Sequence, residues 1–205
     1  TQDADASGIP ADEATFLGVV ADGQKATEAA DGNEIKIVQA HQARSEALCK
    51  ALPKTLEATN WVGVVETVET TLGGDGGVLS ILVADDVAVG TWNNGLSDIG
   101  SGTVIDPESD LYDGLADLEE GDRVYFSGRF DGDSDECVTE SSLVEENGMM
   151  TPDFIFRFTA VGLASDGPLP TSAAAPGESP ADASSSDSEP TQTADPGPKP
   201  VISGD

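Results

Sequence analysis

The feature that most constrains the fold is a series of short segments rich in β-branched and aromatic residues, separated by turn residues. The candidate strands are 61–71, 78–84, 87–92, 123–130 and 152–161. In the last of them Phe154, Phe156 and Phe158 fall on one side and Arg157 on the other. Such alternation predicts strands with one buried face. A helix capped by Ser109 or Asp110 is expected at 109–118, between the third and fourth strands.

The order strand-strand-strand-helix-strand-strand predicts a mainly β protein, a small five-stranded Greek-key barrel of the OB type. The stretches WVGVVETVE from Trp61 and LADLEEGDRVYFSGRF from Leu115 resemble the first strand, and the short helix with the fourth strand, of OB-fold domains. The chain resembles uncharacterised exported bacterial OB-like proteins over 43–163. In these, an N-terminal helix with one cysteine precedes a W-x-G-x-V motif. The resemblance implies a fold and says little about function.

A single amphipathic helix is expected at 33–52, ahead of the barrel. This segment lacks Gly and Pro, and Asp31 or Asn33 can cap its start. Alanines recur at helical spacing at 40, 43, 47 and 51. Pro53 ends the helix, and Cys49 lies on its last turn.

The two ends of the chain have a different composition from the centre. Residues 1–32 are rich in acidic residues and small side chains. We expect a mostly flexible arm in which only 16–20 docks locally. From 165 onward the chain holds eight of its 12 prolines and no aromatic residue. Such a segment cannot bury enough apolar area to offset its ordering entropy. We therefore expect a folded unit at 33–163 and a disordered tail at 164–205.

The net charge of −30 restricts the partners. Between 60 and 163 there are three basic residues and 22 acidic ones. Because nucleic-acid binding depends on Lys and Arg at phosphates, this surface should repel DNA, RNA and anionic lipids. The expected partner is a protein, or a small or oligomeric ligand that is neutral or cationic. No run of about 20 apolar residues predicts a membrane span. The chain starts at Thr1 without Met, so an export signal or anchor could have been removed upstream.

Two cysteines, Cys49 and Cys137, lie 88 residues apart. This spacing excludes zinc-finger and redox CxxC motifs. It suits one long-range disulfide that holds the N-terminal helix on the barrel in an oxidising compartment, so that the protein would be periplasmic, envelope-anchored or secreted. Two reduced, buried thiols are the alternative.

Two motifs resemble catalytic or metal-binding signatures, but each lacks residues that the signature requires. The segment 95–100, GLSDIG, has Ile99 where a nucleophile elbow needs glycine. The single histidine, His41, is a surface or boundary residue of the N-terminal helix. Asp131, Asp133 and Asp135 alternate as in a calcium loop, but Glu136 and Ser142 stand where that loop needs Gly and Glu. They suggest at most weak cation binding, and no cofactor is expected.

The sequence thus favours a non-enzymatic binding or structural module of the bacterial envelope or exterior. Its binding face would combine the second and third strands with the following loop. The candidate binding residues are Trp92, Asn93, Asn94, Ser97 and Asp98. Asn94-Gly95 predicts a turn with positive φ, and 103–105 should return to the core. The alternatives are a carboxylate-dependent hydrolase of glycans or esters and a nucleic-acid-binding OB domain, which the charge disfavours.

Overall fold

The computed structural model describes residues 8–132, 137–142 and 145–170. Most of the expected disordered tail lies outside the described residues. The start of that segment differs from the expectation, since Ala164–Asp166 forms the 3-10 helix η1. Leu169 is also held on the barrel: its N–H donates to Asn60 Oδ1 at 2.7 Å, and Asn60 Nδ2 donates to its carbonyl at 3.1 Å.

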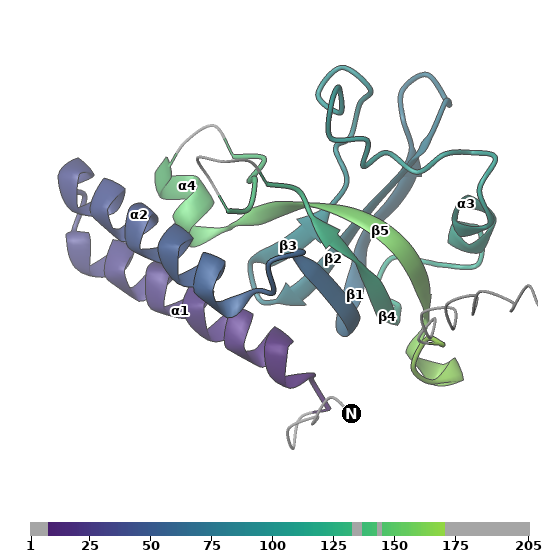
Figure 1. The fold of residues 1–205 in the computed structure, drawn as a ribbon. Coiled ribbons are helices and arrows are strands. Elements are labelled where there is room, and N and C mark those ends of the chain that lie inside the picture. Colours follow the sequence, from purple (N-terminus) through teal and green to yellow (C-terminus); the bar gives the residue numbers. More distant parts are fainter. Residues whose placement is uncertain (1–7, 133–136, 143–144, 171–205) are drawn as a thin grey trace, which may run out of the picture. The chain divides into compact units, whose positions relative to one another are not determined.

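Five strands of the described chain form a closed barrel in the order β1-β2-β3-β5-β4 (Figure 1). The strands are β1 (Glu57–Thr70), β2 (Gly77–Ala84), β3 (Val87–Gly90), β4 (Arg123–Phe130) and β5 (Asp153–Leu163). All neighbouring pairs are antiparallel except β3 and β5. The short helix α3 (Asp110–Leu115) lies between β3 and β4, and Ser109 caps it. The expected five-stranded OB-like barrel is confirmed.

β1 closes the barrel because it pairs with two strands. Its first half pairs with β4, from Glu57 to Val64, and its second half pairs with β2, from Val64 to Thr70. The strand begins earlier than the sequence suggested. Asn60 has a positive φ of 55° beside an irregularity in the register, which breaks the alternation ahead of Trp61.

The N-terminal arm is the main difference from the sequence-based expectation. Ala11–Ala30 forms the helix α1, which pairs with α2 (Glu34–Ala51) beside the barrel (Figure 1). Phe16 is fully buried and packs against the rings of Trp61, Phe130 and Phe154. In each of these three pairs the ring centroids are 5.1 Å apart. α1 is therefore part of the folded unit and its core, not a flexible arm.

α2, the expected N-terminal helix, is confirmed with Asn33 as its cap. It is fastened to the segment between β4 and β5 at two points. Cys49 forms a disulfide with Cys137, with Cα atoms 5.4 Å apart. The buried Arg44 donates to the Gly148 carbonyl at 3.0 Å and pairs with Glu140. Gly148 belongs to the helix α4 (Glu145–Met150).

Candidate functional site

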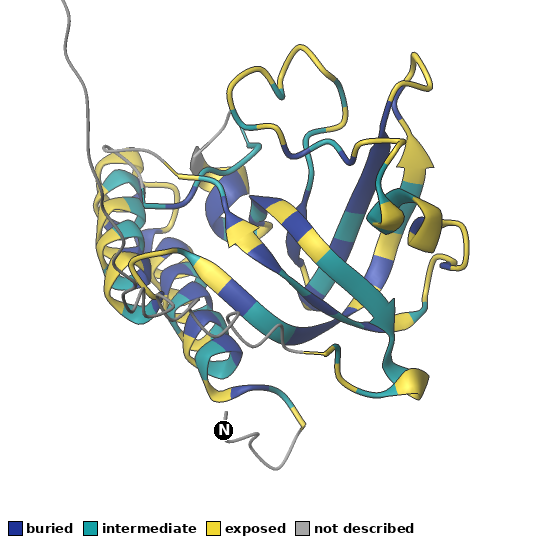
Figure 2. Ribbon diagram, turned by 45° about the vertical axis from the view of Figure 1, so that its right-hand side comes forward, coloured by how far each residue is buried: buried dark blue, intermediate teal, exposed yellow. Residues whose placement is uncertain are grey.

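The predicted binding loop, 93–110, lies between β3 and α3 at one end of the barrel. The β1–β2 turn, 71–76, projects at the same end, and both are largely exposed (Figures 1 and 2). The bases of the two loops are tied together. Gly77 N–H donates to the Ile105 carbonyl at 2.8 Å, and Ile105 N–H donates back at 2.9 Å. Ile105 is buried in the core, as expected.

Two of the predicted binding residues brace the loop from within. Asp98 Oδ1 accepts hydrogen bonds from the N–H and the hydroxyl of Thr103 at 2.5 and 2.7 Å, and Oδ2 accepts from Val104 N–H at 3.1 Å. Asn94 Oδ1 accepts from Ser97 N–H at 2.8 Å. These side chains fix the loop conformation. The expected positive φ at Asn94-Gly95 is wrong, since it occurs at Gly100 and Gly102 instead.

The other predicted residues lie partly at the surface. Trp92 is half-buried, its N–H donates to Thr103 Oγ1 at 2.9 Å, and its indole Nε1 is buried without a hydrogen-bond partner among the described residues. Asn93 and Ser97 are exposed. Trp92 therefore connects the loop to the barrel, whereas Asn93 and Ser97 lie at the surface of the loop.

Sequence reasoning missed the apolar side chains that these loops expose. Leu96 and Ile99 are 80% and 75% exposed, and Leu72 is fully exposed in the neighbouring turn. We call these three residues the apolar rim. These side chains could have been noticed in the sequence, because each is a leucine or isoleucine within a turn segment rich in Gly, Asn and Asp, and such segments are otherwise polar.

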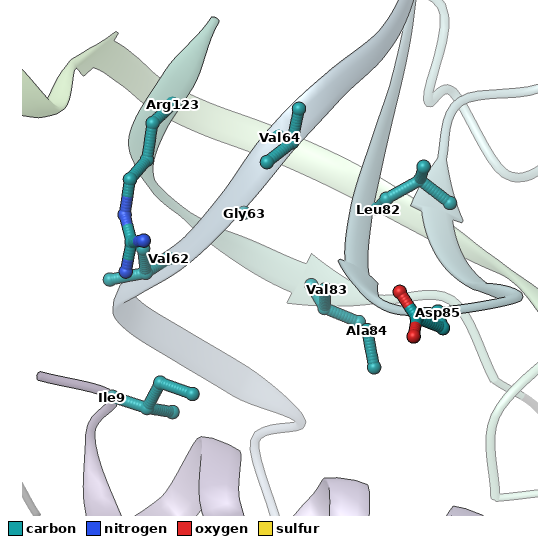
Figure 3. A pocket seen from close by; sticks show the side chains of 9 residues that line it. All are labelled: Ile9, Val62, Gly63, Val64, Leu82, Val83, Ala84, Asp85 and Arg123. Carbon is teal, nitrogen blue, oxygen red and sulfur yellow. The ribbon is translucent and has the colours of Figure 1, made fainter. Parts of the chain in front are cut away.

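A second candidate site is an apolar cleft of about 330 Å³ near the other end of β1 and β2 (Figure 3). The Arg123 side chain borders it on one side and Asp85 lies at its far side, while Ile9, which precedes α1, faces it from a third direction. The lining residues are Ile9, Val62, Gly63, Val64, Leu82, Val83, Ala84, Asp85 and Arg123.

The cleft exists because β1 and β2 separate at this point. Their pairing ends at Val64 and Leu82. Gly63, next to the last paired residue, allows β1 to pass close to β2 at the edge of the cleft. A Cβ at this position would lie 2.3 Å from Ile81 Cγ2 and 2.6 Å from the Leu82 carbonyl oxygen. Any larger residue would push the strands apart. The sequence does not predict that the residues lining the cleft lie together, because they come from four separate segments of the chain.

Asp153, at the start of β5, has a raised pKa. Burial is the main cause, and the Glu66 charge adds to it, whereas the hydrogen bond from the Ser141 hydroxyl at 2.7 Å opposes it. Oδ1 of this carboxylate is buried and has no hydrogen-bond partner among the described residues. The position of Asp153 in the barrel wall explains the shift without a catalytic role.

The suggested cation site is only partly described. Asp131 accepts a hydrogen bond from the Ser101 hydroxyl at 3.0 Å. Asp133 and Asp135 lie outside the described residues. Elsewhere in the described chain, no three His, Cys, Asp or Glu residues gather in a way that could hold a metal ion.

Scans against family models, curated proteins and solved structures each return no match for this chain.

Proposed function

We propose that this protein is a non-enzymatic binding module that acts outside the cytoplasm and docks another protein through the apolar rim. The observation that carries the proposal is the exposure of Leu72, Leu96 and Ile99 on two loops with tied bases. Large apolar side chains exposed on neighbouring loops are candidates for an interaction site. Because Asp98 braces the loop from within, ordering the loop backbone on binding costs less conformational entropy than it would for an unbraced loop.

The charge around the rim indicates the chemistry of the partner. Asp75, Asp106 and Glu108 are exposed in the same two loops, and no Lys, Arg or His occurs from 71 to 122. A partner with an apolar centre and a basic border would complement this surface and associate rapidly. The two loops carry no cation of their own for a nucleic-acid phosphate, and the Arg157 guanidinium beside them already donates to the Ser101 carbonyl.

The Cys49–Cys137 disulfide supports a location in an oxidising compartment. No helix in the described ranges is both long and apolar enough to cross a membrane. An extracytoplasmic module that is periplasmic, envelope-anchored or secreted accounts for the disulfide.

The proposal is tested by capture of proteins from an extract of the source cells on immobilised wild type, a Leu96→Ser/Ile99→Ser variant and an Ile35→Ser variant. Ile35 is the matched control, since it is 72% exposed but lies on α2. We expect one protein to be held by the wild type and the control and reduced at least about tenfold on the rim variant.

Three outcomes would contradict the proposal. Equal capture by all three baits would exclude the rim. Rim-dependent binding to vesicles of neutral phosphatidylcholine would identify a lipid surface instead of a protein. Turnover of a glycan or ester that a single Asp or Glu substitution abolishes would make the protein an enzyme.

A further inference from the structure

We propose that the cleft between β1 and β2 binds an aliphatic monocarboxylate, the chemical class of a medium-chain fatty acid. The carboxylate would sit on the Arg123 guanidinium, and the chain would cover the apolar floor formed by Val64 and Leu82. This site is separate from the apolar rim and does not rest on the function proposed for it.

Arg123 is the most informative residue of the cleft because cations are scarce in this protein, which has nine Lys and Arg against 39 Asp and Glu. In the described part of the chain, its exposed guanidinium has no ion pair or hydrogen bond, although acidic residues are abundant. Its side chain runs along the edge of the cleft toward Val62 (Figure 3). A free guanidinium offers a planar pair of donors that matches a carboxylate.

The register places the charge and the floor in one row. Val64 of β1 pairs with Arg123 of β4 on one side and with Leu82 of β2 on the other. The outer members of this row, Arg123 and Leu82, are two strand spacings apart, which is about 10 Å. A molecule with an anionic head and an apolar tail fits this order of side chains.

The floor is apolar and open to a ligand. Val64 is 38% exposed, an unusual exposure for a valine of this barrel, and Leu82 beside it is half-buried. The volume of about 330 Å³ falls in the lower part of the range for small-molecule sites. Filling the cleft with an aliphatic chain would remove these side chains from water.

Asp85 at the opposite side of the cleft makes the site selective for a single carboxylate (Figure 3). A ligand with a second carboxylate at its far end would place two negative charges close together. We therefore expect monocarboxylates to bind in preference to dicarboxylates of the same length.

The test is calorimetric titration of the full chain with octanoate, octanedioate and 1-octanol. We expect octanoate to bind at one site and the other two to bind at least about tenfold more weakly. Arg123→Gln should weaken octanoate binding at least about tenfold. Arg129→Gln is the matched control, because Arg129 is an exposed arginine of the same strand that does not line the cleft. It should bind octanoate as the wild type does.

The proposal is overturned if the wild type does not bind octanoate at millimolar concentration, or if Arg123→Gln binds it unchanged. Octanedioate binding as tightly as octanoate would refute the role of Asp85. Binding of a leucine-terminated peptide such as acetyl-Gly-Gly-Leu, without octanoate binding, would assign the cleft to protein C-termini. The Leu96→Ser/Ile99→Ser variant should bind octanoate normally, so failure of the proposed rim function is distinguishable from failure of this proposal.

Discussion

The fully buried Glu13 of α1 accepts a hydrogen bond from the Val62 N–H of β1 at 2.9 Å. Val62 lies just beyond the point where β1 stops pairing with β2. The carboxylate thus takes the place of a strand partner at this edge. The neighbouring Asp12 accepts from the Trp61 indole N–H at 2.9 Å, so the first turn of α1 is joined to the barrel at two adjacent residues.

Glu13→Ala should therefore destabilise the protein. It leaves the buried Val62 N–H without its acceptor, which costs about 1–3 kcal/mol in the free energy of unfolding. Urea denaturation measures the change. Glu28→Ala, at an exposed position of the same helix, should change the free energy by less than about 0.5 kcal/mol. Equal stabilities of the two variants would show that Glu13 does not hold α1 on the barrel.

The disulfide should contribute a large part of the stability. Cys49 and Cys137 are 88 residues apart, and closing a loop of this length stabilises by about 4–5 kcal/mol in the chain-entropy model. The Cys49→Ser/Cys137→Ser variant should lose about this amount in urea denaturation. A thiol assay on the denatured, unreduced wild type should find no free thiol, and finding two per chain would remove both the disulfide and the argument for an oxidising compartment.

Asp98→Ala should loosen the predicted binding loop without unfolding the barrel. It removes acceptors from the N–H groups of Thr103 and Val104. Their hydrogen-exchange protection should fall by about fivefold or more, since each lost bond is worth about 1 kcal/mol. Asn93→Ala, at an exposed position of the same loop, serves as the control. Unchanged protection in both variants would contradict the bracing role of Asp98.

Asp153 should make the protein less stable as the pH rises. Because its pKa in the folded state lies above the ordinary value of 3.8, the folded protein holds this proton when the unfolded chain has lost it. Stability from this group is fully present below pH 3.8 and is lost as the pH rises through the folded-state pKa.

Asp153→Asn should remove this loss. The variant should be more stable than the wild type at pH 7, and the difference should shrink as the pH approaches 3.8. Thermal unfolding at several pH values measures it, with the exposed Asp117→Asn as the control. A difference that is independent of pH would show that the Asp153 carboxylate is not the cause.

The parts of the fold that follow from local patterning could be predicted from the sequence. β4 is found at Arg123–Phe130 because apolar and polar residues alternate there. α1 was missed although its buried residues follow a regular spacing of three and four. Those residues are Glu13, Phe16, Val20, Gly23, Thr27 and Ala30. Most of them are small or polar, so the buried face does not look apolar in the sequence.

The candidate sites depend on tertiary structure. Asp98 and Asn94 looked available for a ligand because the sequence does not show that the loop folds back onto their side chains. The cleft needs Arg123 to meet Val64 across β1 and β4, and the sequence does not specify that register. The exposure of Leu96 and Ile99 likewise depends on the loop conformation that the hydrogen bonds to Asn94 and Asp98 fix, and the sequence does not show these bonds.

The proposed contact between the apolar rim and a partner protein can be tested at the rim itself. The most direct test replaces Leu96 with a photo-crosslinking benzoylphenylalanine, with Ile35 replaced in the same way as the control. We predict that one protein is crosslinked from position 96 on irradiation of source-cell extract, that it carries an excess of Lys and Arg, and that it is not crosslinked from position 35. Crosslinking of the same proteins from both positions, or of none from position 96, would contradict it.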